Sequence, residues 1–152
     1  MGEQNEEPSV RLQPLAIDHV ALRVQDCARS EAFYCGLLGC SVAARNEDAG
    51  IVHLRAGHSV IDLVALDGRM GRMAGAEPKV ETRNMHHVCL VFEAFDVPAF
   101  FARLDAQGIE HSSQPQTNLG AQGLGSSFYV LDPDGNLVEL KFYDAAAPAV
   151  AA

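Results

Sequence analysis

Two segments with the same hydrophobic pattern occur in the two halves of the chain. Residues 17–24 have the sequence IDHVALRV and residues 85–92 have the sequence MHHVCLVF. Both are rich in β-branched and aliphatic side chains, which predicts a β-strand in each half. Each segment is followed by an aspartate, Asp26 or Asp96, at a position suited to the N-cap of a helix.

The residues after each aspartate have the spacing of an amphipathic helix. Apolar side chains recur at intervals of three and four residues, as expected for a stripe that packs on a sheet. The residues of these stripes are Phe33, Leu37 and Leu38 in the first half and Val97, Phe100, Phe101 and Leu104 in the second. Gly39 and Gly108 then stand where the C-terminal glycine of a helix is expected.

Further strands are predicted after each helix, so that each half has the order βαβββ. Their ranges are 40–46, 50–56 and 59–66 in the first half, and 109–114, 125–131 and 136–143 in the second. The pattern predicts an α+β fold in one domain, residues 15–143, with modules at 15–66 and 85–143. The linker 67–84 contains three glycines. Glycine-rich residues 118–125 are predicted to form a loop at the edge of a cleft. Residues 1–14 are predicted to be a disordered N-terminus and residues 144–152 a tail.

Charge and composition exclude several classes of function. The 152-residue chain has a formal net charge of −9, which disfavours a nucleic-acid partner. It contains no apolar run of about 18 residues, so no membrane span is expected. Four cysteines without CxxC spacing suit free thiols in a reducing cytoplasm, where we place the protein. Cys89 lies within an apolar strand and is expected in the core.

Histidines and carboxylates occupy matching positions in the two halves. His19 and His87 lie at the same position of their strands, and alternation directs both toward one face. Asp62 and Glu139 each interrupt the apolar last strand of a half, where a charge is costly unless it is paired or bound to metal. We expect His19, His87 and Glu139 to bind one divalent ion, with Asp62 as a further candidate ligand. Such donors suit Fe, Mn, Ni, Co or Zn, and the sequence does not rank these metals.

The other histidines are assigned structural or surface roles. His86 is next to His87 and is expected to face the opposite side of the strand. The remaining three are His53, His58 and His111.

Four segments resemble the vicinal oxygen chelate superfamily, which includes glyoxalase I, class I extradiol dioxygenases, fosfomycin-modifying enzymes and bleomycin-resistance proteins. They are DHVALRV, FYCGLLG, HHVCLVF and FYVLDPDGNLVELKF, and the resemblance covers about residues 15–143. It implies paired βαβββ modules in a U-shaped, partly open mixed sheet around a metal, with helices on the outer face. It also implies a small-molecule substrate and a homodimer. His19, His87 and Glu139 match ligand positions, and Asp62 falls where glyoxalases place a further ligand.

Three functions follow from this resemblance. The first is a metal-dependent enzyme that acts on adjacent oxygens of a small substrate, as a glyoxalase-like lyase or isomerase in which Glu139 can also move a proton. The second is an extradiol-type dioxygenase, because Tyr129 and the residues up to Glu139 resemble the closing half of that signature. The opening half of that signature has a histidine several residues before the tyrosine. Residues 117–125 contain no histidine, and His111 lies further upstream. The third is a small-molecule sequestering protein, and a regulatory or structural protein with a vestigial site stays open beside these three. The sequence does not decide whether glutathione is used. It also leaves open whether the modules pair within one chain or by exchange in a dimer.

Overall fold

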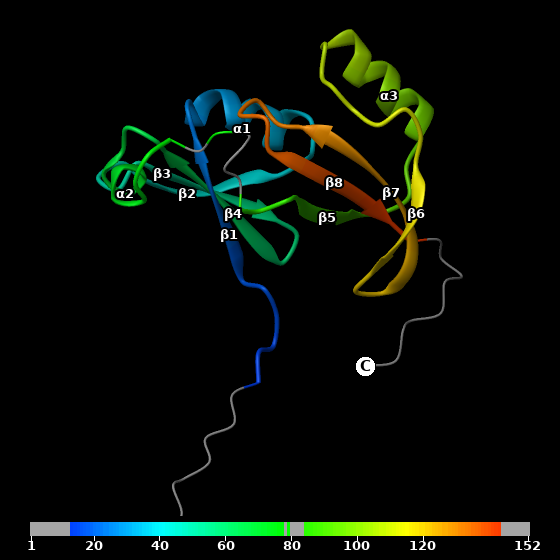
Figure 1. Cartoon of the computed structure of the whole chain (residues 1–152), viewed down its shortest axis with the longest axis horizontal. Coiled ribbons are helices and arrows are strands. Elements are labelled where there is room, and N and C mark those ends of the chain that lie inside the picture. The colour runs from blue at the N-terminus through cyan, green and yellow to red at the C-terminus, as the bar shows by residue number, and fades with distance from the viewer. Residues whose placement is uncertain (1–12, 78, 80–83, 144–152) are drawn as a thin grey trace, which may run out of the picture.

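The chain forms two four-stranded sheets, one from each half, in a computed structural model that describes residues 13–77, 79 and 84–143. Module one contains β1 (His19–Val24), α1 (Cys27–Gly36), β2 (Ser41–Asn46), β3 (Ile51–Ala56) and β4 (Ser59–Ala65), and is followed by the short helix α2 (Arg69–Met73). Module two contains β5 (Val88–Phe92), α3 (Val97–Ala106), β6 (Gln116–Gly120), β7 (Gly123–Leu131) and β8 (Leu137–Phe142). Figure 1 shows the two sheets side by side. The predicted βαβββ order and α+β class are confirmed.

Both sheets have the same mixed topology. Their strand orders are β1-β4-β3-β2 and β5-β8-β7-β6. The first and last strands of each module pair in parallel, and all other neighbours pair antiparallel. In each module the first strand, which begins at or just after the predicted histidine, therefore lies beside the last strand, which carries the carboxylate.

Aspartate caps begin both long helices, as predicted. Asp26 Oδ1 accepts hydrogen bonds from the backbone N–H groups of Ala28 at 2.8 Å and Arg29 at 3.2 Å. Asp96 Oδ1 accepts one from the Ala99 N–H at 2.9 Å. These bonds satisfy backbone donors that the first turn of a helix leaves without partners.

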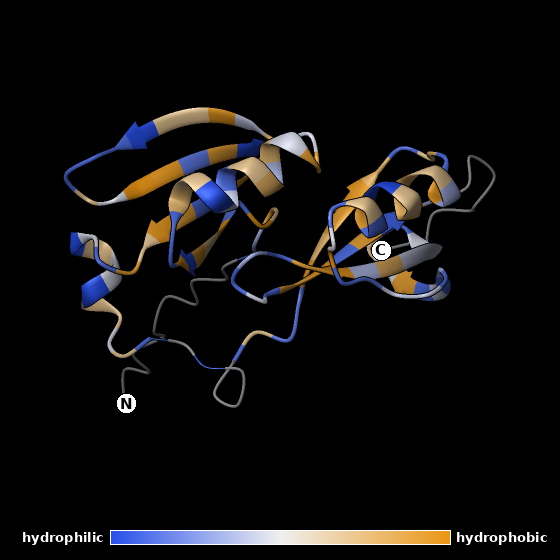
Figure 2. Cartoon of the chain, turned by 90° about the horizontal axis from the view of Figure 1, so that it is seen from above, coloured by the Kyte–Doolittle hydropathy of each residue, from blue (hydrophilic) through white to orange (hydrophobic). Residues whose placement is uncertain are grey.

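A single hydrophobic core joins the two modules through α1. It contains Leu22 and Val24 from β1, Phe33 and Tyr34 from α1, and Phe128 from β7. Hydrophobic residues recur along the strands of both sheets in Figure 2. Because side chains alternate along a strand, His19 of β1 lies on the sheet face opposite this core. His87 stands just before β5 and lies beside Glu139, on the corresponding face of the second sheet.

Polar contacts between α1 and the β7–β8 turn reinforce this junction. The Tyr34 side chain is buried, and its hydroxyl donates to Asp132 Oδ2 at 2.9 Å. Asp134 accepts hydrogen bonds from the Ser30 hydroxyl at 3.0 Å and from Arg29 Nη2 at 3.1 Å. The turn thus fixes the position of α1 against module two.

Two predicted segments of module two are wrong. Residues 109–114 form no strand, and within them only His111 makes an isolated bridge, to Val130. The edge strand is β6, which pairs with β7. The glycine-rich residues 118–125, predicted to be a loop, form the end of this β-hairpin. Gly123, with φ of 106°, supplies the backbone geometry of that turn. Among the described residues, no helix is both long and apolar enough to cross a membrane.

Candidate functional site

The two modules carry a histidine and a carboxylate at equivalent positions of their sheets. Ala21 of β1 lies opposite Asp62 of β4, and Cys89 of β5 lies opposite Glu139 of β8. His19 precedes Ala21 by two positions within β1, so it shares the face of Asp62. His87 precedes Cys89 by two positions, and its contact with Glu139 places it on the Glu139 face. The correspondence expected from the sequence therefore holds in the strand register.

Glu139 is the centre of a polar cluster in module two. Its side chain lies 3.0 Å from His87, measured from Nε2 to Oε2, and the residue is only 6% exposed. Burial acts to raise the pKa of Glu139. Hydrogen bonds from Ser127 and Cys89 and the charges of Lys141 and His87 together outweigh burial and lower this pKa below its usual value. Glu139 is consequently a carboxylate at neutral pH.

Lys141 is a buried cation that the sequence analysis did not single out. It is 2% exposed, its Nζ donates to the Asn118 carbonyl oxygen at 2.9 Å, and it lies 3.6 Å from Glu139 Oε1. The available signal was its position two residues after Glu139, on the same face of an otherwise apolar strand. A buried charge at this position balances the charge of the carboxylate.

Tyr129 lies next to this cluster. It is opposite Glu139 in the β7–β8 pair, and its ring meets the His87 ring edge-on with centroids 5.5 Å apart. Burial, and then the charges of Glu139 and Cys89, raise the pKa of Tyr129. Its hydroxyl therefore stays protonated at neutral pH and can donate a hydrogen bond.

Two expectations about the neighbours of His87 are wrong. His86 does not face away, because its Nδ1 lies 2.9 Å from His87 Nδ1. Both histidines precede β5, so strand alternation does not govern them. Cys89 is exposed rather than part of the core. Partial burial of its thiol and the charge of Glu139 raise the pKa of Cys89 to about 11, so the thiol is neutral.

In module one, Asp62 lies between two histidines. Asp62 Oδ1 is 2.6 Å from His53 Nδ1, across the β3–β4 pair. His19 Nδ1 is 2.8 Å from Asp18 Oδ1, and this hydrogen bond, followed by the charge of Asp62, raises the pKa of His19. Sequence reasoning did not connect His53 with Asp62. The signal was the two-residue turn between β3 and β4, which places them opposite each other.

The remaining histidines lie away from these clusters. His58 is exposed in the β3–β4 turn. His111 stacks on Phe101 of α3, with ring centroids 4.6 Å apart, and its Nε2 is 3.2 Å from Asp105 Oδ1. The His111 ring is thus on the helix side of the sheet, although His111 and Tyr129 both line a pocket at the sheet edge.

The predicted metal ligands form two half-sites in a single chain. Among the described residues, no three His, Cys, Asp or Glu side chains lie close enough to hold one metal ion. The chain brings His87 and Glu139 together, whereas His19 and Asp62 belong to the other module. Imidazole nitrogens and ionised carboxylates are suitable donors for a divalent metal, so the chemistry of these residues fits such an ion.

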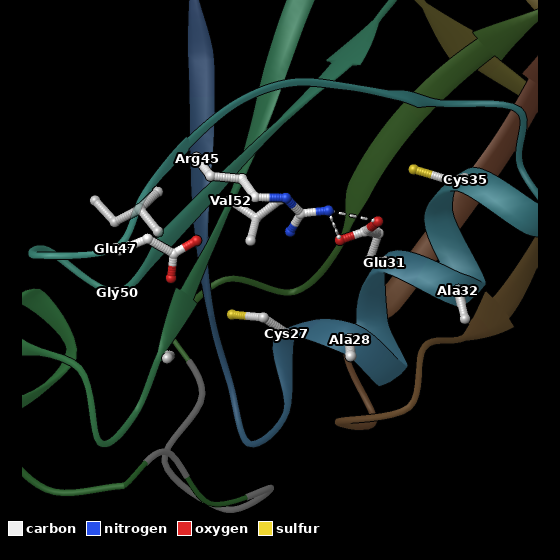
Figure 3. A pocket seen from close by; sticks show the side chains of 11 residues that line it. Cys27, Ala28, Glu31, Ala32, Cys35, Arg45, Glu47, Gly50 and Val52 are labelled. Carbon is white, nitrogen blue, oxygen red and sulfur yellow. Dashed lines mark hydrogen bonds and ion pairs between the residues drawn. The ribbon is translucent and has the colours of Figure 1, made fainter.

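A separate pocket lies between α1 and the β2–β3 hairpin (Figure 3). Cys27, Glu31 and Cys35 line it from α1, and an ion pair of 2.8 Å joins Arg45 Nη2 to Glu31 Oε2 across it. Burial is the main cause that raises the pKa of both thiols, so they are protonated. This pocket has no histidine among its lining residues, and of its two acids Glu31 is paired with Arg45. We therefore take the histidine-bearing faces as the candidate functional site.

Paired βαβββ modules with a histidine and a carboxylate in each define the structural class. The chain belongs to the Glyoxalase/Bleomycin resistance protein/Dioxygenase superfamily, whose family model matches residues 16–140. The resemblance drawn from the four sequence segments is therefore confirmed.

Similar proteins include enzymes with different reactions. The mitochondrial methylmalonyl-CoA epimerase of Homo sapiens is 29% identical over 130 residues, which cover 82% of this chain and 72% of the epimerase. Biphenyl-2,3-diol 1,2-dioxygenase 2 of Rhodococcus globerulus is 30% identical over 138 residues, which cover 86% of this chain and 64% of the dioxygenase. An integron cassette protein from the V. cholerae mobile metagenome has a similar structure, with a TM-score of 0.64 and 30% identity over 89% of this chain and 100% of its own.

Proposed function

We propose that the protein is a divalent-metal-dependent enzyme that moves a proton on a small substrate with adjacent oxygen atoms, as a glyoxalase-like lyase or isomerase. The observation that carries the proposal is the buried, ionised Glu139 held 3.0 Å from His87. A carboxylate with a fixed position and a low pKa is suited both to bind a metal and to exchange a proton with a bound substrate. Similarity to an epimerase supports this class of reaction.

Each site residue has a role in this proposal. His19, His87 and Glu139 are the proposed metal ligands, and Asp62 of module one is a further candidate. The bound metal would supply Lewis-acid stabilisation of negative charge on the substrate oxygens. Glu139 accepts the proton, and the Tyr129 hydroxyl donates a hydrogen bond to a substrate oxygen. Lys141 and Ser127 keep Glu139 ionised before the substrate binds.

We further infer that the complete site forms in a homodimer, with module one of one copy facing module two of the other. Support comes from the separation of the half-sites within one chain and from exposed apolar side chains near the histidines. Ile17, two residues before His19, is 77% exposed, and Val91, on the His87 face of β5, is 53% exposed. Exposed apolar surface around half-sites fits a face that a partner covers.

Proton exchange in D₂O tests the proposed reaction. The protein, loaded with Co(II), Ni(II) or Zn(II), is incubated with a panel of small thioesters and α-hydroxy ketones, and loss of the proton next to the carbonyl is followed by NMR. We expect exchange with at least one compound, and a decrease of about 10²-fold or more in Glu139→Gln. Equal exchange by wild type and Glu139→Gln, with equal metal content, would contradict the proposed role of Glu139.

An extradiol-type dioxygenase is the second candidate. It is supported by the similarity to a biphenyl-diol dioxygenase and by the contact between Tyr129 and His87. The position of His111 counts against it, because the ring of this histidine packs on Phe101 of α3. Fe(II)-loaded protein with catechol gives a direct test: a coloured ring-opened product would favour the dioxygenase over the isomerase.

A further inference from the structure

His53 is an imidazole on the site face of module one that the proposed function leaves without a role. It lies on β3 opposite Asp62 of β4, so the two side chains share the face that bears His19. The His53 side chain is 31% exposed and the Asp62 side chain only 13%. Of the two, His53 therefore presents more of its surface outward from the sheet.

The hydrogen bond between them determines which atom of His53 is available. Asp62 Oδ1 is 2.6 Å from His53 Nδ1, and an ionised carboxylate can only accept a hydrogen bond. Nδ1 therefore carries the proton and donates it to Asp62. In the neutral ring Nε2 is then left with a free lone pair, and no hydrogen bond to it is formed among the described residues.

This arrangement is the one that metal-binding histidines adopt in general. A histidine that ligates through one nitrogen usually donates its other N–H to a carboxylate, which fixes the tautomer and the ring orientation. In this pair the His53 imidazole is the more exposed partner, and the Asp62 carboxylate that accepts its N–H is the more buried one. Asp62 is also one methylene shorter than Glu139, its counterpart in module two, and one of its oxygens is already occupied by His53.

The other module supports the same placement. Tyr129 is opposite Glu139 in the β7–β8 pair as His53 is opposite Asp62 in the β3–β4 pair. In both modules the strand next to the carboxylate thus contributes a ring side chain to the site face, and in module two that ring contacts His87. The position of His53 is therefore a site position and not a remote part of the sheet.

We propose that His53, through Nε2, is a metal ligand of module one, and that Asp62 positions His53 instead of binding the metal itself. The ligands are then His19, His53, His87 and Glu139. This inference rests on the proposed metal-dependent function, and it concerns which residues bind the ion rather than which reaction follows.

Metal affinity of the full-length protein tests the inference without any substrate. Zn(II) affinity is measured by competition with a chromophoric chelator for wild type, His53→Ala, His53→Gln and Asp62→Asn, with His58→Ala as the matched histidine control. We expect both His53 variants to lose as much affinity as His19→Ala, Asp62→Asn to lose about 10–100-fold, and His58→Ala to equal wild type. His53→Gln keeps a polar side chain of similar size, so a loss of affinity equal to that in His53→Ala would reflect the missing imidazole and not a cavity.

Counting nitrogen ligands provides a second readout. In Cu(II)-loaded protein, electron paramagnetic resonance should show one coupled nitrogen fewer in His53→Gln and an unchanged number in Asp62→Asn. The inference is overturned if His53→Gln keeps every coupled nitrogen, or if Asp62→Asn loses more affinity than His53→Ala. If His19→Ala, His87→Ala and Glu139→Gln also bind Zn(II) like wild type, the proposed metal function fails as a whole. If those three lose affinity and the His53 variants do not, only the role of His53 is refuted.

Discussion

At the scale of single residues, the site depends on how neighbours set the charge of each group. Burial alone would favour a neutral Glu139, but Ser127, Lys141, Cys89 and His87 reverse this effect. In module one, Asp18 and Asp62 favour the protonated form of His19. A protonated imidazole cannot bind a metal, so these carboxylates would weaken metal uptake by the proposed site at low pH.

Replacing Lys141 by Met should raise the pKa of Glu139, because the positive charge 3.6 Å from its carboxylate is removed. The pKa can be followed by NMR of ¹³C-labelled glutamate carboxyl groups in metal-free protein. Arg69→Met, in α2 of the other module, serves as a control and should leave the Glu139 titration unchanged. A Glu139 pKa in Lys141→Met equal to or lower than that of wild type would contradict this explanation.

Replacing Asp18 by Asn should lower the pKa of His19, since the hydrogen bond that the His19 ring donates to the Asp18 carboxylate is the largest cause of its elevation. Asp62 still acts on His19 in this variant, so part of the elevation should remain. In metal-free protein, the His19 ring signal in an NMR titration should move at lower pH than in wild type. Titration at the same pH in both proteins would show that the contact at 2.8 Å does not affect His19 in solution.

At the scale of secondary-structure elements, the turn between β7 and β8 connects the modules through α1. Asp132 and Asp134 accept hydrogen bonds from Tyr34, Ser30 and Arg29 of this helix. Burial, together with the charge of Asp132, raises the pKa of Tyr34, so its hydroxyl remains a donor throughout the accessible pH range. The junction therefore combines apolar packing with a buried hydrogen bond to a carboxylate.

Tyr34→Phe should destabilise the protein by about 1–3 kcal/mol, because the ring packing is kept and a hydrogen bond to a charged acceptor is lost. Urea unfolding monitored by circular dichroism measures the change. Tyr143→Phe is the matched control, because the Tyr143 hydroxyl accepts a long bond, of 3.3 Å, from the exposed Gln122 N–H. Equal stability of Tyr34→Phe and wild type would mean that the Asp132 contact contributes nothing.

Much of the fold could be predicted because local patterns and pairing agree along most of the chain. The two caps and the alternation of β1 and β5 depend on residues close in sequence, and they are confirmed. The predicted strand at residues 109–114 is wrong because a strand needs a pairing partner, and the neighbouring strand β7 pairs with β6 instead. A glycine-rich sequence, in turn, did not prevent residues 118–125 from forming a hairpin.

The candidate site was predicted in part for the same reason. Matching positions of His19 and His87, and of Asp62 and Glu139, can be derived from alternation within strands. The contact of His53 with Asp62 and the burial of Lys141 depend on neighbouring strands and on side-chain packing. Such contacts follow from register and not from the pattern of any single segment.

At the scale of the whole molecule, one core links the modules, whereas the two half-sites lie on the sheet faces that point away from this core. The proposed dimer explains this arrangement, because exchange brings His19 of one copy to His87 and Glu139 of the other. It also explains why a single described chain does not bring three ligands together.

A mixture of two inactive variants tests the exchange. In a dimer that contains one His19→Ala chain and one His87→Ala chain, one site carries both substitutions and the other carries neither. Unfolding and refolding the mixed variants should therefore restore tight binding of one metal ion in each mixed dimer, whereas each variant alone binds weakly. If the modules instead pair within one chain, mixing should restore no tight binding.

The most direct test of the central claim is the metal content of the purified protein after loading with Zn(II) and removal of excess ion. We expect about one bound Zn(II) per chain in wild type and in His58→Ala, and almost none in the triple variant His19→Ala, His87→Ala and Glu139→Gln. Equal Zn(II) content in wild type and the triple variant, with both proteins folded by circular dichroism, would contradict the claim that these three residues form the metal site.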